Sequence, residues 1–254
     1  MVDIHSHIIP GIDDGSNSLG TTLKMMKIAE ESGLTKMIAT SHYFRGRFEN
    51  SINDIAKKVQ ELNRTFKEKS VNIEVIPGQE VFIDNHTLEA HKNGVIGCIQ
   101  NTNYMLVEFD MGTLPDNASD ILYELQVSGI KPIIAHPERY GYIQEDIYKI
   151  NDLIDEGIYF QVNAGSVTGV FGKTVQKTAV KLIEDNIVSF IASDAHTTGR
   201  RCPGYKDALK EISKIDKDMA ENFVKNADYL IENANIKNTA QKLKRKKGFF
   251  SFFK

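Results

Sequence analysis

Hydrophobic residues along the chain follow two alternating patterns, short continuous apolar runs and longer stretches with helical spacing. One helical stretch has apolar residues every three or four positions, at Ile52, Ile55, Val59, Leu62 and Phe66. The short runs between such stretches are rich in Ile, Val and Phe, which is typical of strands buried on both faces. This alternation of strand and helix predicts a parallel sheet covered by helices.

Four of the short runs directly follow a residue that suits the end of a helix, namely Gly33, Gly129, Gly157 and Asn186. Glycine and asparagine tolerate the left-handed conformation found at helix C-caps. Three more strands are predicted within residues 2–6, 73–78 and 104–109. Seven strand–helix units in 254 residues predict one α/β domain built as a distorted TIM-like (β/α)7 barrel, with a doubly wound sheet as the alternative. Residues 203–236 are predicted to form terminal helices packed outside it.

Polar residues gather where the predicted strands end, and in parallel barrels that edge carries the chemistry. Five of the seven histidines are among them, while His86 and His91 are expected at the surface. Side chains at positions i and i+2 of a strand point the same way, so each of two His/Asp-x-His pairs can direct two ligands at one centre. Carboxylates packed this closely would repel one another without cations. The residues of this predicted metal centre are His5, His7, the pair Asp13–Asp14, His42, Glu80, Glu108, His136, Asp194 and His196.

With one aspartate of the pair counted, these nine donors exceed the needs of one ion, so two or three ions are expected. Nitrogen and carboxylate ligands without thiolate suit Mn²⁺, Fe or Zn²⁺. Clustered ions of this kind polarise a phosphoryl group and activate water. Arg139, Arg200 and Arg201 follow predicted ligands closely and are either surface residues or groups that stabilise phosphoryl charge. Asp3 is interpreted as a hydrogen-bond partner of a ligating imidazole or as a buried structural carboxylate.

Charge and cysteine content narrow the possible partners. The net charge is −3, but six of the 31 basic residues lie after residue 237, where there is no acid. The acidic remainder argues against nucleic-acid binding. Cys98 and Cys202 are far apart and neither is followed by the arginine of a thiol-based phosphatase. With no signal peptide and no apolar run long enough to span a bilayer, a cytoplasmic location is expected.

The last residues form a basic and aromatic segment. Five basic residues lie between Lys242 and Lys247, and four phenylalanines follow. We expect a domain over residues 1–236 and a flexible tail over residues 237–254. Basic charge beside aromatic rings suits an anionic membrane surface, so peripheral membrane contact through residues 242–254 is one hypothesis. Partner binding and plain disorder are the others.

Several motifs together resemble those of the PHP (polymerase and histidinol phosphatase) superfamily, and most closely the bacterial PHP-type manganese-dependent protein-tyrosine phosphatases of capsule and exopolysaccharide loci. The resemblance extends over nearly the whole chain. It rests on residues 3–7 (DIHSH), 13–15 (DDG), 40–42 (TSH), 78–80 (GQE), 107–109 (VEF), 135–140 (AHPERY), 161–163 (QVN) and 193–196 (SDAH).

The resemblance implies a barrel of the PHP type with three divalent ions, manganese first and iron or zinc as alternatives. It assigns His5, His7, Glu108 and Asp194 to one ion, Glu80, Glu108 and His136 to a second, and Asp14, His42 and His196 to a third. The choice of Asp14 over Asp13 comes from this match. So do the phosphate-binding arginines, Arg139 and Arg201, with Arg200 as the alternative to the latter.

The implied reaction is hydrolysis of phosphotyrosine on the tail of a bacterial tyrosine kinase that regulates capsule or exopolysaccharide synthesis. A hydroxide bridging the metal ions would attack directly, and the phenolate, with a pKa of about 10, needs less acid assistance than a serine alkoxide. Residues 43–48, beside His42, are expected either to contact the peptide or to form an exposed loop. Alternative functions are a phosphatase of small molecules such as histidinol phosphate, a metal-dependent amidohydrolase, and a non-enzymatic metal-binding domain.

Overall fold

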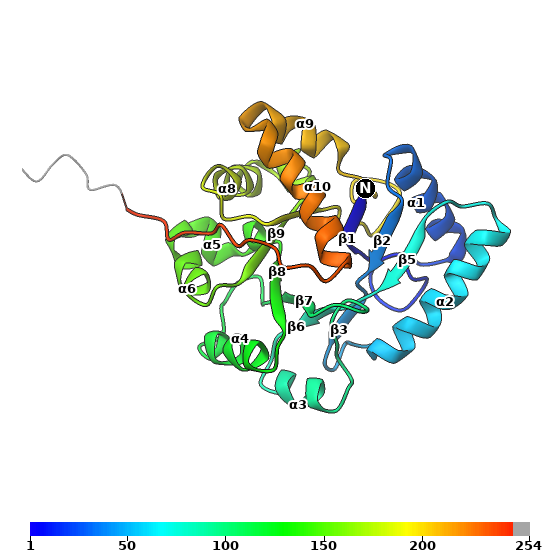
Figure 1. Ribbon diagram of the computed structural model, residues 1–254, viewed down its shortest axis with the longest axis horizontal. Helices are drawn as coiled ribbons and strands as arrows, with labels where there is room; N and C mark the ends of the chain where they lie inside the picture. The colour runs from blue at the N-terminus through cyan, green and yellow to red at the C-terminus, as the bar shows by residue number, and fades with distance from the viewer. Residues whose placement is uncertain (246–254) are drawn as a thin grey trace, which may run out of the picture.

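A ring of parallel strands forms the centre of the computed structural model, which describes residues 1–245 (Figure 1). One ladder has the order β1-β2-β5 and the other the order β10-β9-β8-β7-β6-β3-β4. The strands are β1 (Val2–Ser6), β2 (Lys36–Ala39), β3 (His42–Phe44), β4 (Phe48–Glu49), β5 (Glu74–Pro77), β6 (Glu80–Phe82), β7 (Tyr104–Glu108), β8 (Lys131–Ala135), β9 (Tyr159–Asn163) and β10 (Phe190–Ala192).

Two of the seven predicted strands are continued by a second short strand after a bend. Strand β2 continues as β3 beyond residues 40–41, and β5 continues as β6 beyond residues 78–79. The backbone N–H of Glu80 donates to the carbonyl of Thr40 at 3.1 Å across this bend. A Cβ atom at Gly78 would lie 2.9 Å from Cγ2 of Ile38, so only glycine fits there without displacing the neighbouring strand. The sequence predicted the seven strands correctly but missed β3, β4 and β6.

The first and last strands meet and close the ring. The N–H of Asp194 donates to the carbonyl of His5 at 2.9 Å, and the N–H of His7 donates to the carbonyl of Ala195 at 2.8 Å. Every strand of the ring therefore neighbours the next one in sequence, as in a barrel. The alternative prediction of a doubly wound sheet is wrong.

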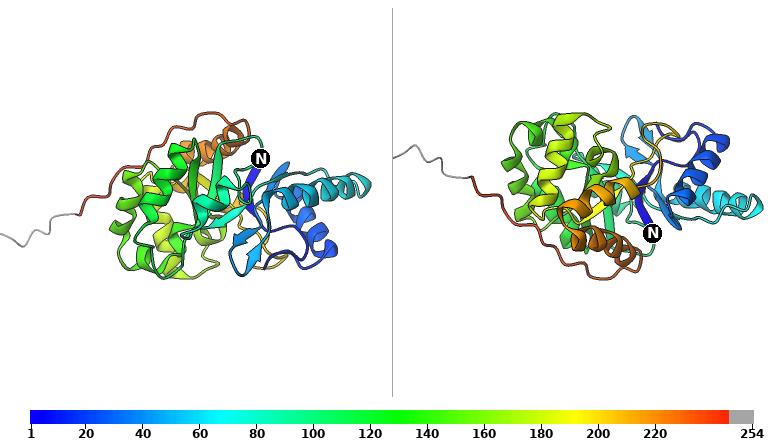
Figure 2. Two further views of the ribbon diagram at one scale, coloured as in Figure 1. Left: turned by 90° about the horizontal axis from the view of Figure 1, so that it is seen from below. Right: turned by 90° about the horizontal axis from the view of Figure 1, so that it is seen from above.

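Helices surround the barrel, as Figures 1 and 2 show. Amphipathic spacing explains their packing, since α2 buries the predicted stripe of Ile55, Val59, Leu62 and Phe66 against the sheet. The terminal helices predicted within residues 203–236 are present as α9 and α10. The helices are α1 (Leu19–Glu31), α2 (Ile52–Glu68), α3 (Thr87–Lys92), α4 (Ala118–Val127), α5 (Gly141–Glu145), α6 (Ile150–Asp155), α7 (Ala164–Val167), α8 (Lys173–Glu184), α9 (Lys206–Ile215) and α10 (Lys217–Ile231), with 3₁₀ turns η1 (Pro137–Arg139) and η2 (Ile147–Lys149).

The open edge of β5 is covered by a side chain. Asn63 of α2 donates from Nδ2 to the carbonyl of Val75 at 2.7 Å and accepts at Oδ1 from the N–H of Val75 at 2.9 Å. The amide of Asn63 thus satisfies the two backbone groups that a neighbouring strand would otherwise bind. This matters because an unpaired strand edge can pair with another chain.

The chain after α10 covers the end of the barrel at which the strands begin, and then runs along the outside of the barrel. The hydroxyl of Tyr104 donates to the carbonyl of Ala234, and that of Tyr159 to the carbonyl of Ile236, both at 2.8 Å. Farther along, the N–H of Leu243 donates to Oδ1 of Asn151 at 2.8 Å, and Figure 2 shows the segment after α10 running along the outside of the barrel. Residues 246–254, which include most of the proposed membrane-contact segment, lie outside the described residues. Within residues 1–245 no helix has the length and apolarity needed to cross a membrane.

Candidate metal centre

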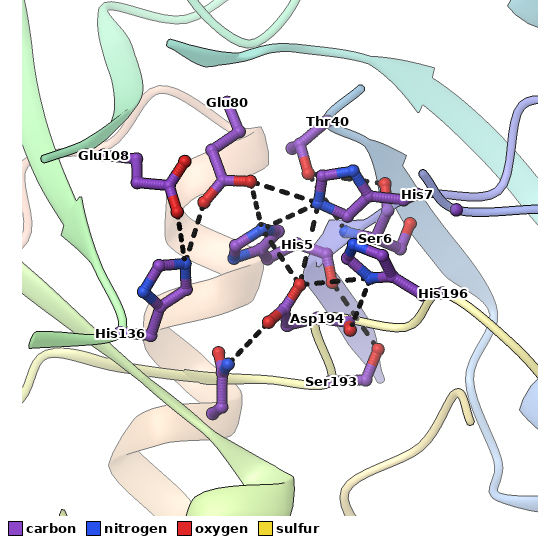
Figure 3. Close-up of polar contacts among 12 residues, drawn as sticks. His5, Ser6, His7, Thr40, Glu80, Glu108, His136, Ser193, Asp194 and His196 are labelled. Atoms are coloured by element: carbon purple, nitrogen blue, oxygen red, sulfur yellow. Dashed lines mark hydrogen bonds and ion pairs between the residues drawn. The ribbon is translucent and has the colours of Figure 1, made fainter. Parts of the chain in front are cut away.

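Histidine and carboxylate side chains from six of the seven barrel strands and the loops after them converge at the C-terminal mouth of the barrel (Figure 3). Strand β1 supplies His5, and the residue just after it supplies His7, whose side chain points the same way. Most of the group is buried, with Asp14 the most exposed member. The structure brings together all nine residues that the sequence selected: His5, His7, Asp14, His42, Glu80, Glu108, His136, Asp194 and His196.

At the centre of the group, two imidazole nitrogens face each other. Nε2 of His5 lies 3.2 Å from Nε2 of His7, and Oε2 of Glu80 lies 3.1 Å from each of these nitrogens. Oδ1 of Asp194 is 3.5 and 3.6 Å from the same two atoms. Four donor atoms therefore surround one point, which fits a shared cation better than a set of pairwise hydrogen bonds.

Two further clusters flank this centre. On one side, Nε2 of His136 lies 2.9 Å from Glu80 and 3.5 Å from Glu108. On the other side, Oδ1 of Asp14 lies 3.3 Å from Nε2 of His42 and 3.4 Å from Nε2 of His196. The contacts differ from the grouping implied by the family resemblance, because Glu80 rather than Glu108 approaches His5 and His7, and His42 lies 3.3 Å from Glu80 as well as close to Asp14.

The backbone is strained at two of these residues. His136 has φ of 34° and Asp194 has φ of 52°, both in the left-handed region that non-glycine residues rarely adopt. His136 directly follows β8, and Asp194 follows β10 after one intervening residue. The chain turns sharply at both places. Such conformations cost free energy and cluster at functional sites. The strain therefore supports a functional role for both side chains.

The pKa shifts of His5 and Glu108 reflect the carboxylates at the centre of the cluster. Burial disfavours the charged form of His5, but Glu80 and Asp194 outweigh this effect and raise its pKa to about 9. Burial and repulsion from Glu80 raise the pKa of Glu108 to about 8. The three carboxylates of the core thus favour additional positive charge nearby, which divalent cations would supply. The donor set and its charge both fit metal ions.

Neighbouring polar side chains orient the imidazoles, a role that the sequence analysis did not assign to Asp13 or Gln161. Oδ2 of Asp13 lies 3.1 Å from Nδ1 of His7, and Oε1 of Gln161 lies 2.8 Å from Nδ1 of His5. Asp3 was one candidate for such a partner, but its Oδ1 instead accepts from the N–H of Ser193 at 3.0 Å. Of the two roles considered for Asp3, the structure therefore supports that of a buried structural carboxylate. Gln161 lies two residues before the end of β9, on the face that points into the barrel. This inward position could have identified Gln161 from the sequence.

Two arginines border the cluster on the side of Asp194. Nη1 of Arg139 lies 3.1 Å from Oδ2 of Asp194, and Nη2 of Arg201 lies 2.8 Å from each of its oxygens. Both guanidinium groups also lie over the ring of Phe171, at 5.0 and 5.9 Å from its centroid. Arg200 instead donates to the carbonyl of Val170. The geometry therefore favours Arg201 over Arg200 as the partner of Arg139.

A cavity of about 240 Å³ lies in front of these groups. One wall carries the metal-cluster residues and both arginines, and another is aromatic. Residues 43–48 belong to the β3–β4 hairpin, and Phe44, Arg47 and Phe48 line the cavity, a position compatible with the expected contact with a peptide. Cys98 and Cys202 do not line it.

Comparison with known proteins agrees with this geometry. Residues 1–232 match the family model described as capsular polysaccharide synthesis, CpsB/CapC. The chain is 34% identical over 252 residues to a putative tyrosine-protein phosphatase CapC of Staphylococcus aureus, covering 98% of this chain and 99% of that protein. It is 32% identical over 255 residues to the tyrosine-protein phosphatase YwqE of Bacillus subtilis (strain 168), covering both in full.

Solved structures agree as well. One from a study of YwqE from Bacillus subtilis and CpsB from Streptococcus pneumoniae, described as unique metal-dependent tyrosine phosphatases, superimposes with a TM-score of 0.92 at 31% identity, covering 96% of this chain and all of that one. A histidinol phosphate phosphatase from Lactococcus lactis superimposes with a TM-score of 0.52 at 15% identity, covering 85% of this chain and 95% of that one. The second likeness concerns the fold alone.

Proposed function

Because the chain belongs to the CpsB/CapC family, we propose that it is a metal-dependent phosphatase that hydrolyses phosphotyrosine in proteins. The observation that supports this most directly is the placement of two arginines beside a cluster of nine histidine and carboxylate residues at one cavity. Metal ligands and guanidinium groups are the two kinds of group that stabilise a phosphoryl group during transfer.

We propose that all nine residues are ligands of three divalent ions, with manganese as the first candidate and iron or zinc as alternatives. Imidazole and carboxylate ligands without thiolate are compatible with each of these metals. When bound, such ions polarise the phosphoryl group and activate water near neutral pH. Asp13 and Gln161 hold two of the imidazoles in the orientation that ligation needs.

Arg139 and Arg201 bind and orient the phosphate. Each guanidinium group has N–H donors beyond those that meet Asp194, and these donors suit the equatorial oxygens of a phosphoryl group. The ring of Phe171 beneath both arginines restricts where the two groups can lie.

Substrate and location follow from the same family context. The substrate we expect is the tyrosine-rich tail of a bacterial kinase that regulates capsule or exopolysaccharide synthesis, and the location we expect is cytoplasmic. Contact with the inner face of the membrane through residues 242–254 remains a hypothesis. Deleting residues 246–254 keeps the contacts of Leu243 and Arg245 with the barrel. Loss of binding to anionic liposomes on this deletion would support the hypothesis, and unchanged binding on deletion of the whole segment, residues 242–254, would reject it.

The function is tested by phosphate release from a phosphotyrosine peptide, with a phosphoserine peptide and histidinol phosphate as competing substrates. We expect the phosphotyrosine peptide to be preferred. His136→Ala and Arg201→Leu should each lower kcat/KM by about 100-fold or more, since each removes a group that stabilises the transition state. His86→Ala, at an exposed histidine outside the cluster, is the control. Full activity of His136→Ala, or a preference for histidinol phosphate, would contradict the proposal.

A further inference from the structure

Three phenylalanines form a continuous row across the strands at one side of the cavity. Phe44 pairs with Phe48 in the antiparallel β3–β4 ladder. In the parallel β3–β6 ladder His42 pairs with Glu80, and the two strands continue in register to Phe44 and Phe82. The rings of Phe44 and Phe82 lie parallel, with centroids 4.1 Å apart and an interplanar angle of 2°. We call Phe44, Phe48 and Phe82 the aromatic row.

The aromatic row differs from the aromatic residues of the core. Its members are half-buried, whereas Phe109, which also lines the cavity, is fully buried. Arg47 is exposed and lies over two of the rings, 5.0 Å from the centroid of Phe48 and 6.0 Å from that of Phe44. Within residues 1–245 this arginine makes no ion pair. Half-buried aromatic surface beside a polar cavity is typical of a wall that receives an apolar part of a ligand.

The strand register fixes how far the aromatic row lies from the metal cluster. His42 and Glu80 are each two residues before a phenylalanine of the row, so ligand and ring point to the same face of the sheet. Two residues of β-strand span roughly 6.6 Å. The aromatic row therefore lies farther toward the mouth of the barrel than His42 and Glu80, by about the length of a phenyl ring. The phosphoryl group would be held at the level of these two residues. The phenyl ring of a bound phosphotyrosine would reach it, while the short alkyl chain of phosphoserine would end before it.

We propose that the aromatic row is the wall that receives the phenyl ring of the substrate, and that it makes the enzyme select aryl over alkyl phosphates. This inference rests on the proposed function, because it concerns the substrate of the same site. Aromatic rings attract one another in offset or edge-to-face arrangements, and the half-buried rings of Phe44 and Phe82 face the cavity in which such a partner would lie. The register of three strands, rather than one flexible loop, holds this wall in place.

The test compares the binding of two phosphonates that the enzyme does not hydrolyse, phenylphosphonate and methylphosphonate, to the full-length, metal-loaded protein by calorimetry. The variants are Phe82→Leu and the double variant Phe44→Leu/Phe82→Leu. Phe82→Tyr keeps the ring and serves as the conservative variant. Tyr123→Leu removes an exposed aromatic residue of α4, outside the cavity, and is the matched control.

We expect the affinity ratio of phenylphosphonate to methylphosphonate to fall about 3- to 10-fold in Phe82→Leu and further in the double variant, the range that aromatic pairs contribute. Phe82→Tyr and Tyr123→Leu should keep the wild-type ratio. The proposal is wrong if both leucine variants keep the wild-type affinity ratio, or if the substitutions weaken the binding of both phosphonates equally. Circular dichroism identifies a misfolded double variant, in which case Phe82→Leu alone decides. Failure of the wild-type protein to release phosphate from a phosphotyrosine peptide would instead refute the proposed function.

Discussion

The carboxylate of Asp13 offers the sharpest test of how the metal cluster is organised, because Asp13 supports it without being assigned as a ligand. Its Oδ2 lies 3.1 Å from Nδ1 of His7 and accepts from the N–H of His42 at 3.2 Å. Its Oδ1 accepts from the N–H of Gly15 at 3.0 Å. Burial acts to raise its pKa, but His7 and the hydrogen bonds outweigh burial and lower the pKa to about 2. Asp13 is therefore a carboxylate across the working pH range.

Asp13→Asn keeps the shape of this side chain but removes its charge and one acceptor. If the amide oxygen faces His7, the amide nitrogen faces the N–H of Gly15, and two donors meet. Loss of an outer partner of a ligating histidine lowers metal affinity by about 10- to 100-fold. This corresponds to about 1.4–2.7 kcal/mol. The ligand atoms themselves are unchanged, so the loss would measure orientation and basicity of the His7 imidazole.

The assay is titration of the metal-free protein with Mn²⁺ by calorimetry, for the wild type and for Asp13→Asn. Asp54→Asn, at the exposed start of α2, makes the same chemical change at a capping position remote from the cavity. We expect it to retain wild-type affinity. Equal affinity of Asp13→Asn and the wild type, or an equal loss in Asp54→Asn, would refute the reasoning.

Three further outcomes are expected. Removing metal with a chelator should abolish phosphate release and lower the melting temperature in calorimetry, because Glu80 and Glu108 lose the cations that offset their repulsion; an unchanged melting temperature would count against a metal-filled cluster. Asn63→Ala should lower the free energy of unfolding in urea by about 1–3 kcal/mol, since Val75 loses both hydrogen bonds, and an effect below that range would show that water replaces them. Burial raises the pKa of the Cys98 thiol to about 11, so its thiolate fraction is low at pH 8 and grows as pH rises toward 11. Mass spectrometry should show slow alkylation of Cys98 by iodoacetamide at pH 8 in the folded protein, and alkylation as fast as in the unfolded chain would contradict this.

Much of the barrel could be predicted from the sequence because its strands are rich in apolar residues and four of them begin shortly after a glycine or asparagine that follows a helix. The strands that escaped prediction are different. Strand β6 comprises Glu80, Val81 and Phe82, and only its central residue points into the core. Strand β4 is two residues long. Such segments pair because the neighbouring backbone is already in place, and this tertiary effect leaves no periodic pattern in the sequence.

The site shows the same division. Residues that directly follow predicted strands could be selected as a group, since the fold brings strand ends together. Residue spacing could not separate Asp13 from Asp14, because both lie in a turn whose path depends on the rest of the barrel. The structure separates them, with Asp14 facing His42 and His196 and Asp13 behind His7. The aromatic row was also hidden, because its register is defined by pairing between β3, β4 and β6.

The seam between β1 and the chain after β10 has a consequence for the order of events in folding. His5 and His7 lie on one side of this seam and Asp194 and His196 on the other, joined by backbone hydrogen bonds. Nearly 190 residues separate the two sides in sequence, and contacts of such separation form late because the intervening loop must first be ordered. A chain still emerging from the ribosome holds only part of the ligand set until residue 196 has been released. Metal loading would therefore act as a final, stabilising step that follows closure of the barrel and resists its reopening.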